Sequence, residues 1–132
     1  PLLNIHIVKG GSQAEVTDLL DTIHGSMVDA FKVPFRDRYQ IVTEHEADRL
    51  IMQDTGLGFD RSDKRVLIHM TTKPRSQEMK EAFYRIVTQN LNERCGIPPE
   101  DVMFSLIENS SADWSFGFGE AQFLTGKLYE PE

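Results

Sequence analysis

The stretch LLNIHIVKGGSQAE, residues 2–15, decides the fold. Residues 2–8 are mostly apolar and place leucine or isoleucine at alternate positions, which predicts a β-strand. The KGG segment of residues 9–11 ends that strand. Ser12 and Glu15 then have the spacing of a capping box, in which each side chain bonds the other's backbone N–H. The stretch therefore predicts a strand that leads directly into a helix.

This helix and the strand after it complete a first unit. The apolar residues at helical spacing are Val16, Leu19, Leu20, Ile23, Met27 and Phe31. Pro34 disfavours helical geometry in the residue before it, so the helix is expected to end near Val33. Tyr39 to Thr43 reads YQIVT and predicts a second strand.

The same pattern recurs in the second half of the chain. Val66 to Met70 is a nearly continuous apolar run that predicts a strand, and Ser76 is a candidate cap for the next helix. The apolar stripe of that helix is Met79, Ala82, Phe83, Ile86, Val87 and Leu91. Gly96 and Pro98 end it, because glycine adopts the left-handed conformation and proline cannot continue a helix. Val102 to Ile107 predicts the last strand.

Together the units predict an α+β fold, in which duplicated β-α-β units form a four-stranded core sheet with two helices on one face. Each helix can join two parallel strands by a right-handed crossover. The 132 residues fit a single domain, with repeats of about 1–62 and 63–132 that are alike in architecture only. The other face of the sheet needs a cover, and neighbouring subunits are its expected source, which predicts a homo-oligomer.

Two segments lie outside these units. Arg49 to Ile51 predicts a short strand, and Thr55 to Gly58 has turn chemistry. The tail from Trp114 to Leu128 is rich in glycine and aromatic residues and predicts a short hairpin.

Composition narrows the class of partner and compartment. The net charge of −7 argues against nucleic acid or an anionic membrane, although a local cationic pocket could still bind a small anion. The single cysteine, Cys95, excludes an intrachain disulfide and favours a reducing cytoplasm. We find no signal peptide and no apolar run long enough to cross a membrane.

Common cofactor and triad motifs are missing. The histidines, His6, His24, His45 and His69, do not have the spacing of paired metal ligands, so each is interpreted as structural or exposed. There is no GxSxG elbow, and the short GLG and GFG segments lack the third glycine of a dinucleotide fingerprint. The sequence therefore predicts no metal and no cofactor.

Pro1 is the first candidate for chemistry. It is either a point where the chain was cut or numbered, or a reactive secondary amine that the adjacent strand fixes on the sheet. A free α-amine has a pKa of about 7.7–8.0, which burial or a cation lowers and a carboxylate raises. Position alone supports both interpretations equally.

Charged residues near the strand ends are the next candidates. Lys73 and Arg75 follow the third strand, where loops of α/β sheets collect ligands, and could hold an anion at the next helix N-terminus. Charge alone favours a solvated surface pair instead. Asp37 precedes the second strand, at the same edge of the sheet as Pro1 if the first two strands are parallel neighbours. It could activate water or hold cationic Pro1; alternatively it pairs with a neighbouring arginine, Arg36 or Arg38.

The tail adds a cluster of aromatic residues. Trp114, Phe116 and Phe123 lie close together in sequence. Aromatic residues at this density form either a packing patch at a subunit interface or a pocket wall that excludes water.

Taken together, these residues resemble the tautomerase superfamily, and within it the malonate semialdehyde decarboxylases. The resemblance covers essentially the whole chain and rests on RDRYQIV (36–42), QDTGLG (53–58) and ADWSFGFGEAQFLTG (112–126), of which DWSFG is most specific. It implies a homotrimer with active sites near subunit contacts. It also implies a lyase that needs no cofactor and converts malonate semialdehyde, a small anionic oxo acid, to acetaldehyde and carbon dioxide.

By position, the resemblance makes Pro1 the key amine, Asp37 the carboxylate that activates water or holds Pro1, and Arg75 the ligand of the substrate carboxylate. The substrate-binding residues that it implies are Tyr39 and an apolar wall of Trp114, Phe116, Phe123 and Leu128. The family carries arginine on both sides of the proline that corresponds to Pro74, in the loop after the third strand. This chain has Lys73 at the first position, which keeps the charge, loses the planar fork and leaves the exact substrate open.

Several functions remain open at this point. Decarboxylation has two routes: Asp37 activates water to form a hydrate that fragments, or neutral Pro1 forms an iminium ion. A second class is a tautomerase or hydratase acting on 2-oxo or acetylenic acids, including phenylenolpyruvate-like substrates, with Pro1 as base. A third is a trimeric binding protein without catalysis. A Pro1 pKa well below neutrality favours the base, and one above neutrality favours the cationic acid.

Overall fold

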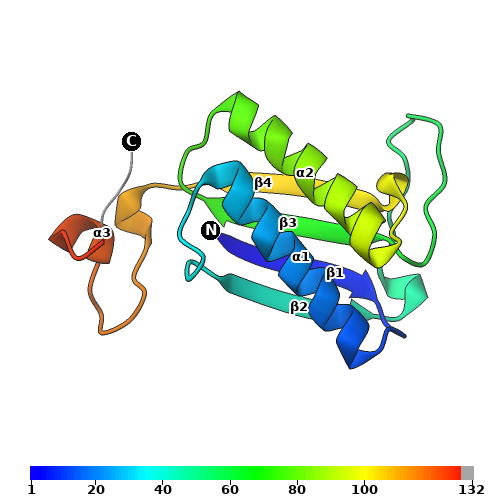
Figure 1. Cartoon of the computed structure of the whole chain (residues 1–132), viewed down its shortest axis with the longest axis horizontal. Helices are drawn as coiled ribbons and strands as arrows, with labels where there is room; N and C mark the ends of the chain where they lie inside the picture. The colour runs from blue at the N-terminus through cyan, green and yellow to red at the C-terminus, as the bar shows by residue number, and fades with distance from the viewer. Residues whose placement is uncertain (129–132) are drawn as a thin grey trace.

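The computed structural model describes residues 1–128. Its strands are β1 (Leu2–Val8), β2 (Tyr39–His45), β3 (Val66–Thr72) and β4 (Val102–Glu108), which form one four-stranded sheet in the order β2-β1-β3-β4. Two long helices, α1 (Gln13–Phe31) and α2 (Gln77–Cys95), lie side by side across one face (Figure 1). β1 is parallel to β2, β3 is parallel to β4, and β1 is antiparallel to β3. The predicted α+β architecture is confirmed.

The helix ends follow the signals in the sequence. The Ser12 hydroxyl accepts the Glu15 N–H at 3.1 Å, and the Glu15 carboxylate accepts the Ser12 N–H at 3.0 Å, so the predicted capping box is present. Ser76 caps α2 by accepting the Met79 N–H at 3.1 Å. Gly96 ends α2 in the left-handed conformation, with φ of 67°, as predicted.

The core lies between the helices and the sheet. The buried residues at alternate positions of the two central strands are Leu3, Ile5 and Ile7 of β1 and Val66, Ile68 and Met70 of β3. Phe31 of α1 stacks on Phe83 of α2 with ring centroids 4.9 Å apart, so aromatic contact joins the two helices. Within residues 1–128, no helix has the length and apolar character needed to cross a membrane.

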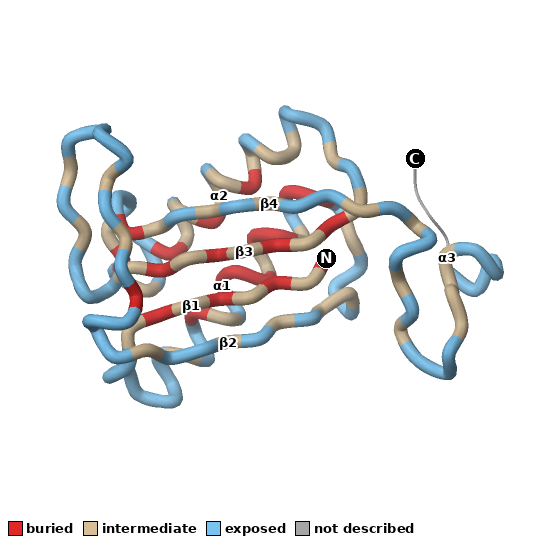
Figure 2. Tube along the Cα trace, turned by 180° about the vertical axis from the view of Figure 1, so that it is seen from behind, coloured by how far each residue is buried: buried red, intermediate tan, exposed pale blue. Residues whose placement is uncertain are grey.

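The opposite face of the sheet has no helix over it in the described part of the chain (Figure 2). Large apolar side chains there are exposed: Ile41 by 51% and Ile107 by 53%. Tyr39 and Met103 lie on the same face, by the strand register. This open face is the surface for which the sequence predicts a cover from other subunits.

The predicted strand at Arg49 to Ile51 is wrong. Residues Ala47–Arg49 form a short 3-10 helix instead. The Arg65 guanidinium donates to the carbonyl groups of Ala47 at 2.6 Å and Leu50 at 2.8 Å. A distant side chain thus satisfies backbone groups that a strand would have paired with a neighbouring strand.

The predicted hairpin in the tail is also wrong. A 3-10 helix at Ser111–Asp113 precedes the tail, and the tail itself contains a short helix, α3 (Gln122–Thr125), and projects from one end of the sheet (Figure 1). The Gln122 side chain accepts the Phe116 N–H at 2.9 Å and donates to the Gly117 carbonyl at 2.8 Å. One amide side chain therefore takes the bonds that a partner strand would have made.

Candidate active site

Strand pairing gathers the candidate residues at one end of the sheet, where β1 and β2 begin and β3 ends. We call this end the Pro1 edge. The register pairs Leu2 with Tyr39, so the chain segments before β1 and β2 meet there. Antiparallel pairing of Leu2 with Thr71 brings the end of β3, and the loop after it, to the same place. The proximity of Asp37 to Pro1, predicted if β1 and β2 were parallel neighbours, follows from this topology.

Pro1 and Asp37 form the centre of this edge. The Pro1 nitrogen lies 3.5 Å from Oδ2 of Asp37, and the two side chains are 2% and 24% exposed. Burial lowers the pKa of the Pro1 amine from its usual 8.0 and is the largest influence on it. The Asp37 carboxylate opposes that change, whereas the positive charges of Arg75 and Lys73 add to it. Burial and the two cations together outweigh Asp37, so the pKa of the amine is lowered on balance.

The alternative pairing of Asp37 with Arg38 is not what the structure shows. Arg38 Nη2 donates to the Asp21 carboxylate at 2.8 Å, and its Nε donates to the Gln40 side chain at 2.9 Å. Arg38 is therefore directed toward α1 and away from the Pro1 amine.

Arg75 is fixed by three contacts. Its Nε donates to the hydroxyl of Thr72 at 3.1 Å, and its guanidinium carbon lies 5.1 Å from the ring centroid of Phe31. Its backbone N–H donates to the Glu108 carboxylate at 2.9 Å, which differs from the expectation that this loop would offer its N–H groups to an anion. Burial lowers the pKa of the Arg75 guanidinium, and Asp37 opposes this change. The backbone N–H of Arg75 is thus occupied by Glu108, and the guanidinium is the group of this residue that can bind an anion.

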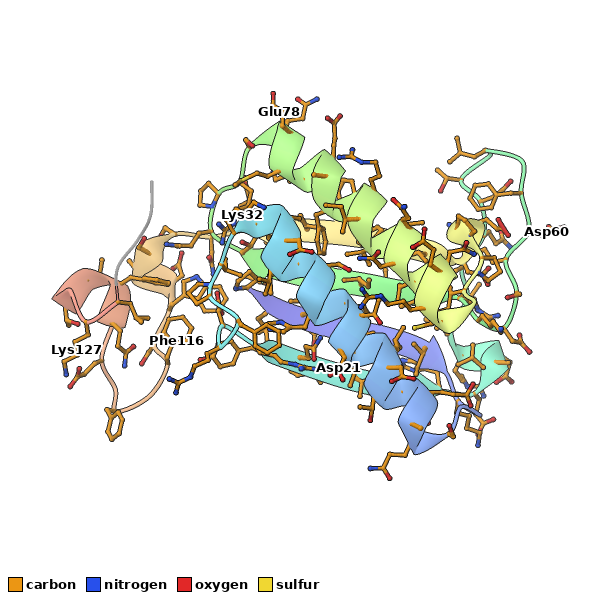
Figure 3. The ribbon with its side chains drawn as sticks, viewed as in Figure 1. Asp21, Lys32, Asp60, Glu78, Phe116 and Lys127 are labelled. Carbon is orange, nitrogen blue, oxygen red and sulfur yellow. The ribbon has the colours of Figure 1, made fainter. Side chains whose placement is uncertain are left out.

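Lys73 and the aromatic residues of the tail border the same edge. The Lys73 ammonium lies 3.9 Å from the ring centroid of Phe123, in cation–π geometry. Phe116 stacks between Trp114 and Tyr39, with centroid distances of 5.6 Å on each side, and meets Phe123 edge-on at 5.4 Å. Figure 3 shows Phe116 reaching from the tail toward the sheet. The tail therefore supplies an apolar wall beside the cations.

Leu128 lies past the end of α3 and is 42% exposed. Its backbone N–H donates to the Gln122 carbonyl at 3.3 Å. The structure thus places four of the predicted substrate-binding residues in one cluster of rings, three of them on the tail, and Leu128 at the end of the described part of that tail.

The residues that hold these groups in place are not predicted from the sequence. Thr72 and Glu108 support Arg75, and Asn109 accepts the indole N–H of Trp114 at 2.8 Å. Glu108 ends β4 directly beside Thr72, so the parallel pairing of the last two strands could have indicated it. Helical spacing places Phe31 in the apolar stripe of α1 and does not reveal that Arg75 lies over its ring.

Two other features of the described residues lie away from this edge. A cavity of about 410 Å³ opens at the opposite end of the sheet, where its lining includes Lys9, Arg65, Arg94 and Cys95. Among residues 1–128, no group of three or more histidine, cysteine or acidic side chains is arranged to hold a metal ion. His6 and His45 do form a pair on the open face, with Nδ1 and Nε2 2.8 Å apart.

A mixed sheet of two β-α-β halves with a buried proline amine at its edge defines the class of protein: an α+β protein of the tautomerase type. The chain belongs to the tautomerase family, since two models described as tautomerase enzymes match residues 37–117 and 1–60. It is 49% identical to the probable tautomerase YrdN of Bacillus subtilis, over 97% of this chain and 99% of that protein.

Solved structures are similar over the full length. A malonate semialdehyde decarboxylase, described with decarboxylase and hydratase activities, is 50% identical with a TM-score of 0.96, covering 98% of this chain and all of that one. The FG41 malonate semialdehyde decarboxylase, inhibited by 3-bromopropiolate, is 38% identical with a TM-score of 0.95, covering 99% and 100%. A fused 4-OT symmetric trimer shares the fold at 24% identity, with a TM-score of 0.78 and coverage of 96% and 99%. The resemblance read from the sequence is confirmed.

Proposed function

We propose that this chain is a cofactor-independent decarboxylase that converts malonate semialdehyde, or a close 3-oxo acid, to acetaldehyde or its homologue and carbon dioxide. The observation that carries the proposal is the Pro1 nitrogen 3.5 Å from Asp37, on an edge that also holds Lys73 and Arg75. Identity of 50% to a malonate semialdehyde decarboxylase over nearly the whole chain supports this choice of reaction.

The charges of the Pro1 edge suit a small anionic substrate. In the proposed complex the Arg75 guanidinium binds the substrate carboxylate, since Thr72 and Phe31 already hold that side chain in place. Lys73 adds a second positive charge as a compact ammonium group. The rings of Phe116 and Phe123 exclude water from the carboxylate, which favours its conversion to neutral carbon dioxide.

The reaction needs an acceptor for the electron pair of the breaking carbon–carbon bond. That pair moves toward the aldehyde carbonyl, where a cationic Pro1 or Lys73 stabilises the developing negative charge on oxygen. The resulting enol then takes a proton at carbon and becomes acetaldehyde. In the hydrate route, Asp37 removes a proton from the water that adds to the carbonyl; as carbon dioxide leaves, the electron pair forms the enol double bond and one hydroxyl of the hydrate departs, protonated, as water. In the iminium route, neutral Pro1 forms a carbon–nitrogen bond with the aldehyde and water leaves; the electron pair then moves into the iminium ion, and the enamine is protonated at carbon and hydrolysed to acetaldehyde and free Pro1.

The experiment that tests this proposal follows malonate semialdehyde by ¹H NMR with purified protein. The parent chain is expected to produce acetaldehyde, and Pro1→Ala is expected to lose most of that activity. The matched control is Ser26→Ala, a buried position on the face of α1 toward α2, which is expected to react like the parent. No acetaldehyde above the uncatalysed rate, or full activity in Pro1→Ala, would contradict the proposal.

The two routes predict different products with a reductant. Cyanoborohydride converts an iminium ion to a stable amine, so mass spectrometry would find the added substrate carbons on the peptide that contains Pro1. The hydrate route leaves that peptide unmodified while turnover continues.

A second candidate is a tautomerase or hydratase of 2-oxo or acetylenic acids, with Pro1 as the base. Two observations favour it: the similar Bacillus protein is named a probable tautomerase, and burial lowers the pKa of Pro1, which favours the neutral amine. This candidate predicts that phenylenolpyruvate is ketonised faster than any 3-oxo acid is decarboxylated. Rates for both substrates, measured on one preparation, decide between the two activities.

We also propose that the chain forms a homotrimer through the open face. Ile41 and Ile107 expose about half of their surface there in a single chain, and a protein of the same fold is a trimer. Light scattering after gel filtration is expected to give three times the chain mass. Ile41→Glu places a charge on that face and is expected to shift the mass toward the monomer.

A further inference from the structure

The turn that carries Asp37 has little packing of its own. Asp37 closes the turn by donating its N–H to the Pro34 carbonyl at 2.9 Å, and its carboxylate reaches the Pro1 nitrogen. Pro34 and Arg36 are exposed, and the Phe35 side chain is 66% exposed. Side-chain burial therefore does little to fix this turn, and the position of Asp37 depends on hydrogen bonds.

One of those bonds comes from the interior of α1. His24 is only 1% exposed, and its Nε2 lies 2.6 Å from the carbonyl oxygen of Phe35. A carbonyl only accepts hydrogen bonds, so Nε2 carries the hydrogen. The two rings also meet edge-on, with centroids 4.8 Å apart. A buried side chain of α1 thus donates a hydrogen bond to Phe35, one of the two central residues of the turn.

The other nitrogen of His24 has a different environment. Nδ1 is buried and has no hydrogen-bond partner among the described residues. With its hydrogen on Nε2 and none on Nδ1, the ring is the uncharged Nε2–H tautomer. A second hydrogen on Nδ1 would have no acceptor among the described residues. The ring is therefore used on one side only, as a donor to the turn.

A second connection to α1 lies on the far side of Asp37. Arg38 bonds the Asp21 carboxylate, which Figure 3 shows on the helix beside β2. Gln40, which accepts from Arg38, donates to the Leu20 carbonyl at 2.8 Å. Asp21 is exposed, so its ion pair contributes little, whereas the shielded bond of His24 is the stronger restraint.

We propose that His24 is a positioning residue that acts through the Phe35 carbonyl to hold the Asp37 carboxylate against the Pro1 nitrogen. This inference rests on the proposed function for its meaning in catalysis, but the geometry it describes is independent of the substrate. Because the attraction between Asp37 and the amine falls with distance, a turn released from α1 weakens the support that Asp37 gives to the protonated amine.

The experiment is an NMR titration of ¹⁵N-labelled Pro1 in the parent, His24→Phe, Asp37→Asn and the double variant. Phenylalanine keeps a ring of similar shape and removes the donor. His24→Phe is expected to lower the pKa of Pro1 by about 0.5–1 unit, since a carboxylate at contact distance typically raises such a pKa by one unit or more. In the Asp37→Asn background, the same substitution is expected to cause no further change.

Two variants separate positioning from general destabilisation. His24→Gln retains an N–H near the place of Nε2 and is expected to recover part of the Pro1 shift. Ser26→Ala removes a buried hydroxyl on the same helix, which donates to the Thr22 carbonyl at 2.7 Å, and is expected to lower the melting temperature without moving the Pro1 titration. If His24→Phe does not fold, the comparison of His24→Gln with His24→Leu replaces it.

The outcomes are distinct. A folded His24→Phe protein that titrates like the parent, or that shifts Pro1 equally with and without Asp37, would overturn the positioning role. Failure of the parent to decarboxylate a 3-oxo acid would overturn the proposed function and leave the titration result standing, because the titration uses no substrate.

Discussion

The two edges of the sheet have the same topology and different chemistry. At the Pro1 edge, Asp37 precedes β2; at the opposite edge, which we call the Asp101 edge, Asp101 precedes β4. Asp37 is 24% exposed, and its carboxylate lies 3.5 Å from an amine. Asp101 is fully buried, and its carboxylate accepts both the backbone N–H of Ser62, at 2.7 Å, and the Ser62 hydroxyl.

The comparison shows that equivalent positions of a duplicated fold can serve different ends: one carboxylate stabilises the fold, and the other is available for chemistry. The carboxylate of Asp101 has its bonding capacity satisfied by protein groups, so it holds a loop. Asp37 retains capacity and faces positive charges, which is the arrangement that reactive sites need. The cavity at the Asp101 edge does not give that edge a comparable reactive arrangement. Its Lys9 pairs with Glu46, and its Arg65 bonds backbone carbonyl groups.

The largest expected effect comes from blocking the Pro1 amine. A glycine left before Pro1 converts the secondary amine to an amide, and we expect activity to fall by about 10²–10⁴-fold, the usual contribution of an acid, base or nucleophile. The measurement is kcat/KM for the proposed substrate. A melting temperature equal to that of the parent is the control for folding, and an active extended chain would remove Pro1 from the chemistry.

Substituting each aspartate in turn tests directly whether Asp37 serves catalysis and Asp101 serves stability. Asp37→Asn is expected to lower kcat about 100-fold with little change in stability, because its carboxylate makes few structural bonds. Asp101→Ala is expected to lower the free energy of unfolding by about 2 kcal/mol, because two Ser62 donors lose their acceptor. Urea unfolding and kcat on both variants test the pair. Equal loss of kcat in the two variants would show that catalysis does not depend on Asp37 more than on Asp101.

The sequence predicted the strands, helices and caps because each depends on local periodicity and on residues within one turn. It also predicted that Pro1 and Asp37 share an edge, since parallel pairing follows from the β-α-β connection. The errors at residues 49–51 and in the tail have one physical cause. In both places a side chain satisfies backbone groups that a strand would have paired: Arg65 from far along the chain and Gln122 from within the tail. Hydrophobic periodicity gives no sign of such bonds.

The supports of the site were beyond sequence analysis for a related reason. His24 is interpreted from the sequence only as structural or exposed, and Thr72 lies beyond the strand predicted at residues 66–70; the contacts of both with the site depend on which loop packs against them. The aromatic wall was visible as a cluster in sequence, but its stacking on Tyr39 required the fold. Residues that act are therefore easier to find in a sequence than residues that position them.

A smaller effect is expected at Lys73. Lys73→Arg restores the planar fork beside Arg75, and we expect KM for a 3-oxo acid to fall by about tenfold, which corresponds to 1.4 kcal/mol for a bidentate contact. Because Lys73 lies over the Phe123 ring, the matched control is Phe123→Leu in both backgrounds. An unchanged KM in Lys73→Arg would mean that this position does not contact the substrate carboxylate.

The smallest expected effect is the pH dependence of stability. Burial lowers the pKa of the Pro1 amine in the folded protein below the value of 8.0 that it has when unfolded. Between these two values the unfolded chain binds more protons, so the stabilising contribution is complete above pH 8 and is lost as the pH falls through the folded-state pKa. Urea unfolding of the parent between pH 9 and pH 7 is expected to show this loss.

The chain with glycine before Pro1 supplies the matched control for that slope. Its amine lies one residue farther from the core, so its pKa is expected to change less on folding and its stability to vary less over the same range. Staying above pH 7 also avoids His6, whose pKa is lowered by burial and by His45 and whose contribution is therefore lost below its usual 6.5. Equal slopes in the two chains would mean that the Pro1 edge does not bury its amine, and the contrast with the closed Asp101 edge would then rest on the carboxylates alone.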